Sequence, residues 1–142
     1  MGELRVDFYI TPAGNARLSL ACKLAEKAYL AAHQVLIWHT DAAELQALDE
    51  MLWTFRDGAF VPHEVLAGQA EGPQTPVLLS CGPLPPGELD VLINLAADVP
   101  DFLPRARRVV EIIDGDEGRR QAGRARYRAY LERGVQPASH NL

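Results

Sequence analysis

Gln34-Val-Leu-Ile-Trp-His39 is an almost uninterrupted apolar stretch in a chain of 142 residues. A strand exposed on one face alternates apolar and polar side chains, whereas a strand buried on both faces is apolar nearly throughout, as in a parallel sheet. The stretch therefore predicts an inner strand of a largely parallel β-sheet.

The preceding segment predicts a strand followed by a helix. Arg5-Val-Asp-Phe-Tyr-Ile10 is rich in β-branched and aromatic residues and is bounded by Pro12 and Gly14, which is typical of a strand. The next apolar residues recur at i, i+3 and i+4, so we expect a helix that Asn15 caps and that ends near Ala32. These apolar residues are Leu18, Ala21, Cys22, Ala25, Ala28 and Tyr29.

The segment after the apolar stretch predicts a second helix. Thr40 or Asp41 is placed to cap it, and Glu44 falls in its first turn. Its inner face is expected to carry Leu45, Leu48, Met51 and Leu52. Residues 53–75 then show no regular pattern, and loops of this length are usually functional or mobile.

The rest of the chain predicts three more strands and a final helix. The expected segments are strands at 76–80, 90–94 and 107–113, a turn-rich connector at 83–87, a helical turn at 100–104, the last helix at 116–133 and a frayed tail at 135–142. The link between the third and fourth strands is too short for a full crossover helix. We therefore expect that pair to be antiparallel or irregularly joined.

Strands that alternate with helices predict the fold class α/β, with a single three-layer α/β/α domain and a mostly parallel, Rossmann-like sheet. A chain of this length is expected to form one domain and to bury about 68% of its unfolded-state surface. We place the domain at residues 1–134 and a flexible C-terminal tail at residues 135–142.

The sequence predicts a cytoplasmic protein without membrane contact. No apolar run approaches the ~20 residues that a membrane span needs, and the amino-terminal residues do not have the layout of a signal peptide. Cys22 and Cys81 are then expected to be reduced thiols with structural roles.

Common catalytic and cofactor-binding patterns are missing from the sequence. The turn Thr11–Ala16 has one glycine where a dinucleotide fingerprint needs three, and Asp41 is better explained as a helix cap. No serine lies in a nucleophile-elbow motif. The histidines do not have metal-ligand spacing; they are His33, His39, His63 and His140. We therefore expect no enzyme activity, no cofactor and no metal.

The last helix concentrates basic charge. Nine arginines and five acidic residues lie between Arg105 and Arg133, against five basic and fourteen acidic residues in positions 1–104. On an ideal helix one stripe faces outward and a row of alanines lies against the sheet. The stripe is Arg120, Arg124, Tyr127, Arg128 and Leu131, and the row is Ala122, Ala125 and Ala129.

Two interpretations of this stripe differ in function. It is either an ordinary solvated face or a site for a peptide carboxylate, because arginine pairs with carboxylates and tyrosine offers an apolar wall. Nucleic acid is a third candidate, but a protein of net charge −5 is poorly suited to binding phosphates. Trp53, Phe55 and Phe60 in the irregular segment either pack under the loop or line a recognition pocket.

Seven short motifs occur in this chain in a characteristic order. They are Phe8-Tyr-Ile10, Leu48-Asp-Glu-Met-Leu-Trp53, Phe60-Val-Pro-His63, Ala67-Gly68, Asp90-Val-Leu-Ile-Asn94, Val109-Val-Glu-Ile-Ile113 and Arg124-Ala-Arg-Tyr-Arg-Ala-Tyr130. Together they resemble the chi subunit family of bacterial DNA polymerase III holoenzyme. The resemblance extends from about Val6 to Gly134.

The resemblance implies a non-catalytic accessory subunit of the clamp loader, acting in DNA replication within an assembly that has DNA-directed DNA polymerase activity. Members of that family bind the acidic C-terminal tail of single-stranded DNA-binding protein and join the clamp loader through the psi subunit. Some also partner a helicase, which leaves open a repair helicase as a further partner. The family fold resembles nucleotide-binding domains without binding a nucleotide, and direct DNA binding is expected to be weak or absent.

The family's tail-binding positions can be carried over residue by residue. They fall on Trp53, Phe60, Ile113, Arg120, Arg124, Tyr127 and Arg128. One position departs from the family pattern, because the arginine expected one turn after Tyr127 is Leu131 here. We expect four of these side chains to wall one pocket for the tail's terminal ring, with Arg124 on its carboxylate; the four are Trp53, Phe60, Ile113 and Tyr127. The alternatives are a Rossmann-like nucleotide-binding enzyme and a direct single-stranded DNA-binding module.

Overall fold

A computed structural model describes residues 4–55, 57–58, 60–67 and 75–142 of the chain. Within these residues seven strands form one sheet in the order β3-β4-β2-β5-β6-β1-β7, and each neighbouring pair is parallel. The elements are β1 (Arg5–Ile10), α1 (Arg17–Leu30), β2 (Val35–Trp38), α2 (Ala42–Thr54), β3 (His63–Val65), β4 (Val77–Ser80), β5 (Leu89–Asn94), a 3₁₀ turn (Leu103–Arg105), β6 (Ala106–Ile113), α3 (Glu117–Glu132) and β7 (Ala138–Asn141). The predicted α/β class is confirmed.

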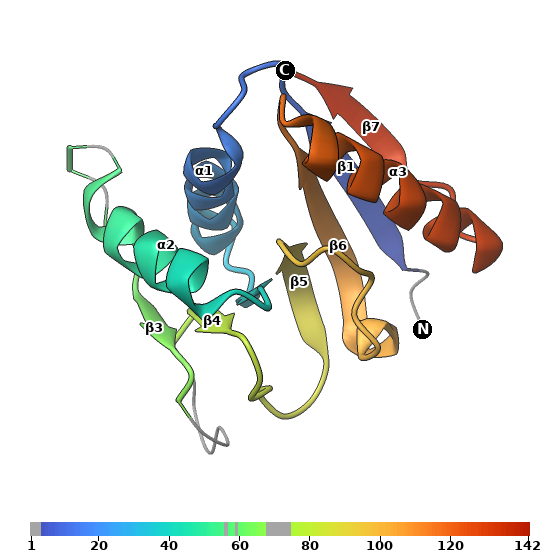
Figure 1. Ribbon diagram of the computed structural model, residues 1–142. Helices are drawn as coiled ribbons and strands as arrows, with labels where there is room; N and C mark the ends of the chain where they lie inside the picture. Colours follow the sequence, from blue (N-terminus) through green and yellow to red (C-terminus); the bar gives the residue numbers. More distant parts are fainter. Residues whose placement is uncertain (1–3, 56, 59, 68–74) are drawn as a thin grey trace.

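The helices divide between the two faces of the sheet. α1 and α2 pack on one face with one apolar cluster, whereas Tyr127 and Tyr130 of α3 belong to a second cluster on the other face. Figure 1 shows α2 and α3 over opposite ends of the sheet. This division follows from strand order. The connections through α1 and α2 run toward β3, the connection through α3 runs toward β7, and right-handed crossovers in opposite directions place helices on opposite faces.

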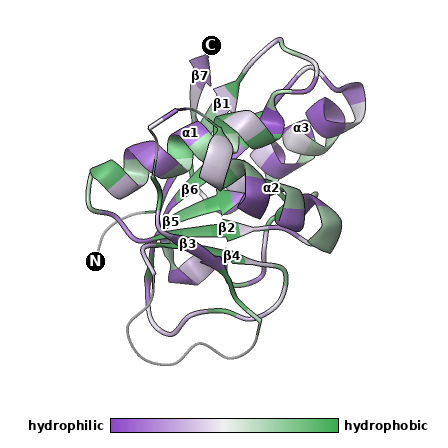
Figure 2. Cartoon of the chain, turned by 90° about the vertical axis from the view of Figure 1, so that its left-hand side faces the viewer, coloured by the Kyte–Doolittle hydropathy of each residue, from purple (hydrophilic) through white to green (hydrophobic). Residues whose placement is uncertain are grey.

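The apolar stretch that predicted an inner strand forms β2, which lies between β4 and β5. Val35, Leu36 and Ile37 are all buried, and Figure 2 colours β2 and its neighbour β5 as hydrophobic. Val35 and Ile37 contact the cluster under α1 and α2, while Leu36 contacts the cluster on the opposite face. The run is apolar throughout because both faces of the strand are covered.

The cap predicted for α2 is confirmed and the cap predicted for α1 is not, while α3 begins at a cap that was not predicted. Asp41 accepts hydrogen bonds from the amides of Ala43 (2.9 Å) and Glu44 (3.1 Å) at the start of α2. Asp116 accepts from the amide of Arg119 (2.9 Å) at the start of α3. At α1 the expectation was wrong, because Ala16 and not Asn15 occupies the N-cap position.

Between residues 53 and 94 one prediction was wrong, and of the two alternatives for the next strand pair only the irregular connection is confirmed. The segment expected to be an irregular loop contains β3, a three-residue edge strand that pairs with β4. The third and fourth predicted strands, β4 and β5, are not an antiparallel pair, since β2 lies between them and is parallel to both. An edge strand this short leaves too few residues for a recognisable alternation.

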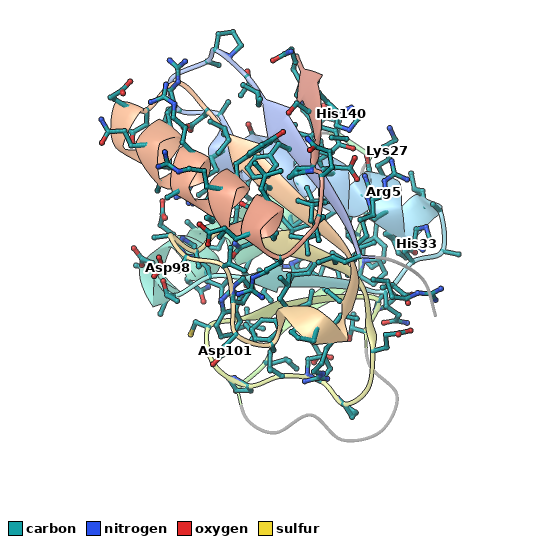
Figure 3. All side chains as sticks on the ribbon, turned by 90° about the vertical axis from the view of Figure 1, so that its right-hand side faces the viewer. Arg5, Lys27, His33, Asp98, Asp101 and His140 are labelled. Atoms are coloured by element: carbon teal, nitrogen blue, oxygen red, sulfur yellow. The ribbon has the colours of Figure 1, made fainter. Side chains whose placement is uncertain are left out.

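The C-terminal segment also differs from the expectation of a frayed tail. Residues 138–141 form β7, which extends the sheet beside β1, and the amide of Leu142 donates to the carbonyl of Ile10 at 2.8 Å. The Nε2 atom of His140 lies 2.9 Å from Oδ1 of the buried Asp7, and its ring stacks on Tyr9 with centroids 4.7 Å apart. Figure 3 labels His140 and Arg5 along this edge.

The two cysteines, both in the described part of the chain, are free thiols. Cys22 lies in the core, and burial raises the pKa of its thiol to about 12. Cys81 follows β4 and is exposed, so it does not contribute to the core. Among the described helices none is long and apolar enough to cross a membrane.

Candidate peptide-binding site on the last helix

The face that α3 turns to the sheet differs from the predicted alanine row. Its buried residues are Gly123, Arg126 and Tyr130, whereas Ala125 is exposed. The helix is therefore rotated relative to the expectation. A large aromatic ring and an arginine, with one glycine, form the contact in place of small alanines.

Arg126 is buried because it meets a buried carboxylate of β6. Its Nε atom donates to Oε1 of Glu111 at 2.8 Å, and its Nη1 atom donates to the carbonyl of Ala97 at 3.0 Å. The hydroxyl of Tyr130 (2.6 Å) and Nδ2 of Asn94 (3.0 Å) donate to Oε2 of the same carboxylate. Burial raises the pKa of Glu111 and that of Tyr130. This network fixes α3 against β6, and the sequence signal for it was an acidic residue within an apolar strand.

A small apolar cavity of about 180 Å³ opens between α3 and the ends of β1 and β6. It is lined by Phe8, Ile10, Ile113, Arg120, Gly123, Arg124 and Tyr127. The rings of Phe8 and Tyr127 lie 5.2 Å apart at 53°, and the hydroxyl of Tyr127 accepts a hydrogen bond from Nε2 of Gln136 at 3.1 Å. We call this cavity the α3 pocket.

The α3 pocket brings together four of the seven predicted site residues. They are Ile113, Arg120, Arg124 and Tyr127. Arg128 is also exposed, one turn beyond Arg124 on α3. The Arg124 side chain is 61% exposed, and its Nη1 atom lies 3.9 Å from Oε1 of Glu117, which is too long for a strong hydrogen bond. The arrangement can hold an apolar group in the cavity and a carboxylate at the arginines.

Sequence reasoning missed Phe8, Ile10, Gly123 and Gln136. Phe8 and Ile10 are two apart on β1 and so face the same side of the sheet. That alternation was readable, but it did not indicate that α3 would lie over this strand.

The structure separates the other two predicted site residues from the pocket. Trp53 and Phe60 are 52% and 63% exposed, their rings lie 6.0 Å apart, and Trp53 also lies 4.2 Å from the ring of His63. They belong to α2 and the segment before β3, at the other end of the sheet from β1. The prediction that these two aromatic residues share one pocket with Ile113 and Tyr127 is therefore wrong. Neither aromatic is packed under the loop, and together they form a second surface, which we call the aromatic patch.

The cleft at the carboxyl ends of the strands is the usual ligand site of open α/β sheets. Here a cavity of about 530 Å³ lies at that position. The amide of Arg17 at the start of α1 donates to Oδ2 of Asp114 at 3.3 Å, while Asp41 and Asp116 cap α2 and α3. Each helix amino terminus that would attract a phosphate therefore faces a carboxylate of the chain itself.

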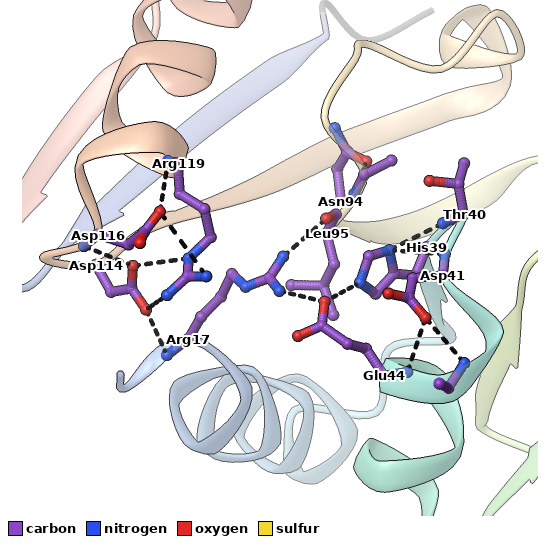
Figure 4. A network of polar contacts seen from close by, with 12 residues as sticks. Arg17, His39, Thr40, Asp41, Glu44, Asn94, Leu95, Asp114, Asp116 and Arg119 are labelled. Atoms are coloured by element: carbon purple, nitrogen blue, oxygen red, sulfur yellow. Dashed lines mark hydrogen bonds and ion pairs between the residues drawn. The ribbon is translucent and has the colours of Figure 1, made fainter. Parts of the chain in front are cut away.

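The arginines of this cleft are paired in the same way (Figure 4). Arg17 lies 2.5 Å from Oε1 of Glu44, which His39 also contacts at 2.7 Å, and Arg119 contacts Asp114 at 2.8 Å. Burial opposes ionisation of Glu44 and Asp114. Hydrogen bonds from His39 and Arg17 nonetheless lower the pKa of Glu44, and hydrogen bonds from Arg119 lower that of Asp114. The cleft is thus a self-neutralised polar network and offers little to a nucleotide.

Metal coordination has no visible basis in the residues described, where no group of three or more His, Cys, Asp or Glu side chains is arranged to hold an ion. His63, for example, is buried and hydrogen-bonds to the carbonyls of Val61 and Asp49.

The strand order and the two helix layers define a small Rossmann-like domain, with an apolar pocket beside two arginines of its last helix. A family model described as "DNA polymerase III chi subunit, HolC" matches residues 4–138. The chain therefore belongs to the DNA polymerase III chi subunit family, a family of replication accessory subunits.

Relatives named DNA polymerase III subunit chi agree with this assignment. The one from Pseudomonas aeruginosa is 41% identical over 140 residues, covering 97% of this chain and 96% of the relative. Those from Haemophilus influenzae and Escherichia coli are 30% and 31% identical, covering 87% and 78% of this chain and 85% and 76% of the relatives.

Proposed function

We propose that this chain is a non-catalytic adaptor that binds the acidic C-terminal tail of single-stranded DNA-binding protein and joins the clamp loader through the psi subunit. Family membership supports a role in the replicative polymerase. The α3 pocket carries the peptide-binding part of the proposal, because it combines an apolar cavity with two arginines at its rim.

The chemistry of the pocket matches the chemistry of the tail. The tail is acidic and ends in a proline–phenylalanine carboxylate. The terminal ring fits a cavity walled by Phe8, Ile113 and Tyr127, and the carboxylate fits the exposed guanidinium of Arg124. Arg120 and Arg128 lie on the same helix for upstream aspartates. Ordering a disordered tail costs free energy, so we expect micromolar affinity.

A bridging subunit also needs a second surface that stays free when the tail is bound. The aromatic patch of Trp53 and Phe60 meets this need, since it is exposed and lies across the sheet from α3. Exposed aromatic side chains are typical anchors of protein interfaces. We therefore assign psi docking to the aromatic patch and tail binding to the α3 pocket.

Titration calorimetry tests tail binding directly, with one peptide that carries the full tail and one that lacks the final phenylalanine. Arg124→Ala should weaken binding of the full peptide by about 2–4 kcal/mol, because a desolvated carboxylate loses its partner. Arg107→Ala is the matched control, since its side chain is also 61% exposed and lies 3.6 Å from a glutamate, Glu88. Absence of binding at low salt, or equal binding of both peptides, would rule out the proposal.

Direct single-stranded DNA binding is less well supported. Arg108, Arg119 and Arg126 pair with the carboxylates of Asp7, Asp114 and Glu111, whose side chains are fully buried. Three of the nine arginines counted between Arg105 and Arg133 are therefore neutralised by carboxylates of the chain itself. Binding of an oligonucleotide at ~50 mM salt would overturn this conclusion.

A further inference from the structure

Gly123 stands in the middle of α3, where glycine is a poor helix former and alanine would be favoured. An isolated glycine inside a helix usually has a packing or functional reason. Gly123 is buried and lines the α3 pocket, so its missing side chain bears on both the packing of the helix and the shape of the pocket.

Ile113 occupies the space that a side chain at position 123 would need. A Cβ atom built on Gly123 would lie 2.2 Å from Cδ1 and 3.3 Å from Cγ1 of Ile113. The first of these distances is far below any tolerable contact between carbon atoms. The end of the Ile113 side chain is therefore tucked against the helix backbone at Gly123, and any larger residue there must displace it.

The displaced side chain has one open direction. On its inner side Ile113 belongs to the packed cluster that contains Phe8 and Tyr130, whereas on its outer side it lines the α3 pocket. Packed interiors accommodate an extra methyl group poorly. A side chain at position 123 would thus push Ile113 outward, into the cavity of about 180 Å³.

We propose that Gly123 is a positioning residue of the α3 pocket, which holds Ile113 against the helix and so keeps the cavity open for the apolar side chain at a peptide's carboxyl terminus. The inference rests on the proposed function and assigns to one residue the pocket's selectivity for the terminal ring. The arginines supply charge, while Gly123 sets the depth of the apolar cavity beneath them.

Gly123→Ala tests the inference, with Gly118→Ala as the matched control on the same helix. A Cβ atom at position 118 would meet only Oδ2 of Asp116, at an ordinary 3.4 Å. Both variants should fold, as checked by circular dichroism and thermal melting, because alanine is the better helix former. Calorimetry then measures each variant against the full tail peptide and the peptide without its final phenylalanine.

The unmodified protein and Gly118→Ala should prefer the full peptide by about tenfold or more, as burial of a phenylalanine ring implies. Gly123→Ala should lose this preference and bind both peptides within about threefold of each other. Ile113→Val removes Cδ1, so the double variant Ile113→Val/Gly123→Ala should regain most of the preference. If Gly123 only stabilised the fold, Gly123→Ala would leave the ratio of the two peptide affinities unchanged. Adding Ile113→Val would then have no lost preference to restore.

The outcomes separate the two proposals. If the unmodified protein does not distinguish the peptides, the proposed tail-binding function fails. If it distinguishes them and Gly123→Ala does so equally well, only the role of Gly123 fails. The role also fails if the folded double variant remains as unselective as Gly123→Ala.

Discussion

Trp53 and Tyr127 lie on opposite faces of one parallel sheet, the first on α2 near the β3 edge and the second on α3 near the β7 edge. Tyr127 lines the α3 pocket, whereas Trp53 contacts Phe60 and His63. The sheet therefore separates two exposed surfaces, and a ligand of one does not cover the other.

This separation predicts that the two surfaces act independently. Tyr127→Ala should weaken binding of the tail peptide about tenfold, since it removes one wall of the pocket, while Trp53→Ala should change it less than about twofold. For the psi subunit the order should reverse. Calorimetry with the peptide and with purified psi gives both sets of affinities.

Additivity provides the check on independence. Substitutions at distant sites without shared partners usually add within about 0.5 kcal/mol. The double variant Trp53→Ala/Tyr127→Ala should therefore bind the peptide like Tyr127→Ala alone. A clear loss of peptide binding in Trp53→Ala would return Trp53 to the tail site and contradict the separation.

The pair Arg126 and Glu111 predicts a large effect on stability. Their side chains are 7% and 0% exposed and lie 2.8 Å apart, so removing one partner leaves a buried charge uncompensated. Arg126→Ala should lower the free energy of unfolding by about 3–5 kcal/mol. Urea denaturation followed by circular dichroism measures this change.

Arg128→Ala is the control, because Arg128 is exposed on the same helix. It should change the unfolding free energy by less than about 0.5 kcal/mol, as surface substitutions usually do. Equal losses in the two variants would mean that the buried pair does not fix α3.

The burial of Arg126 also shows the limit of what the sequence could predict. The inner strand β2 was predictable because its apolar run is a local signal of burial on both faces. Arg126 was not, since a helical arginine normally faces water, and only the carboxylate of Glu111, brought beneath it by the fold, makes its burial favourable. The sequence placed Arg124 and Tyr127 on one face correctly. The strand order that puts Trp53 on the opposite side of the sheet is tertiary information.

The β7 edge was missed for a related reason. Ala138–Asn141 is short and polar and pairs with β1 on one side only, so it does not require the apolar alternation of an inner strand. Its attachment involves the buried Asp7 of β1, which His140 and Arg108 contact. Burial opposes ionisation, but hydrogen bonds from His140 and Arg108 lower the pKa of Asp7.

The lowered pKa of Asp7 predicts how this edge responds to acid. An acid whose pKa is lower in the folded state stabilises the fold above its ordinary value, here 3.8, and this stabilisation is lost as the pH falls through the folded-state value. The amides of β7 and Leu142 should therefore exchange with solvent increasingly faster as the pH falls below about 4, relative to amides of β2. Hydrogen exchange corrected for its intrinsic pH dependence makes this comparison.

Asp7→Asn should remove this response. At neutral pH it should be less stable than the unmodified protein by about 1–3 kcal/mol, because Arg108 and His140 lose a charged acceptor. The difference should shrink in acid. Asp101→Asn, at an exposed position that Figure 3 labels far from this edge, should show neither effect. A constant difference between Asp7→Asn and the unmodified protein at all pH values would contradict the assignment.

Leu131 is the position where the basic face of α3 departs from the family pattern. Its side chain is 43% exposed and follows Tyr127 by one helical turn. Leu131→Arg restores the arginine that the family resemblance led us to expect, and it should tighten binding of the acidic peptide by a few fold at low salt, as one exposed ion pair allows. The gain should fade as the salt concentration rises, since exposed charges are screened.

Calorimetry at two salt concentrations measures both effects, and Leu131→Gln separates the effect of the added charge from that of the lost apolar surface. If Leu131→Arg and Leu131→Gln bind alike at low salt, position 131 does not face the tail.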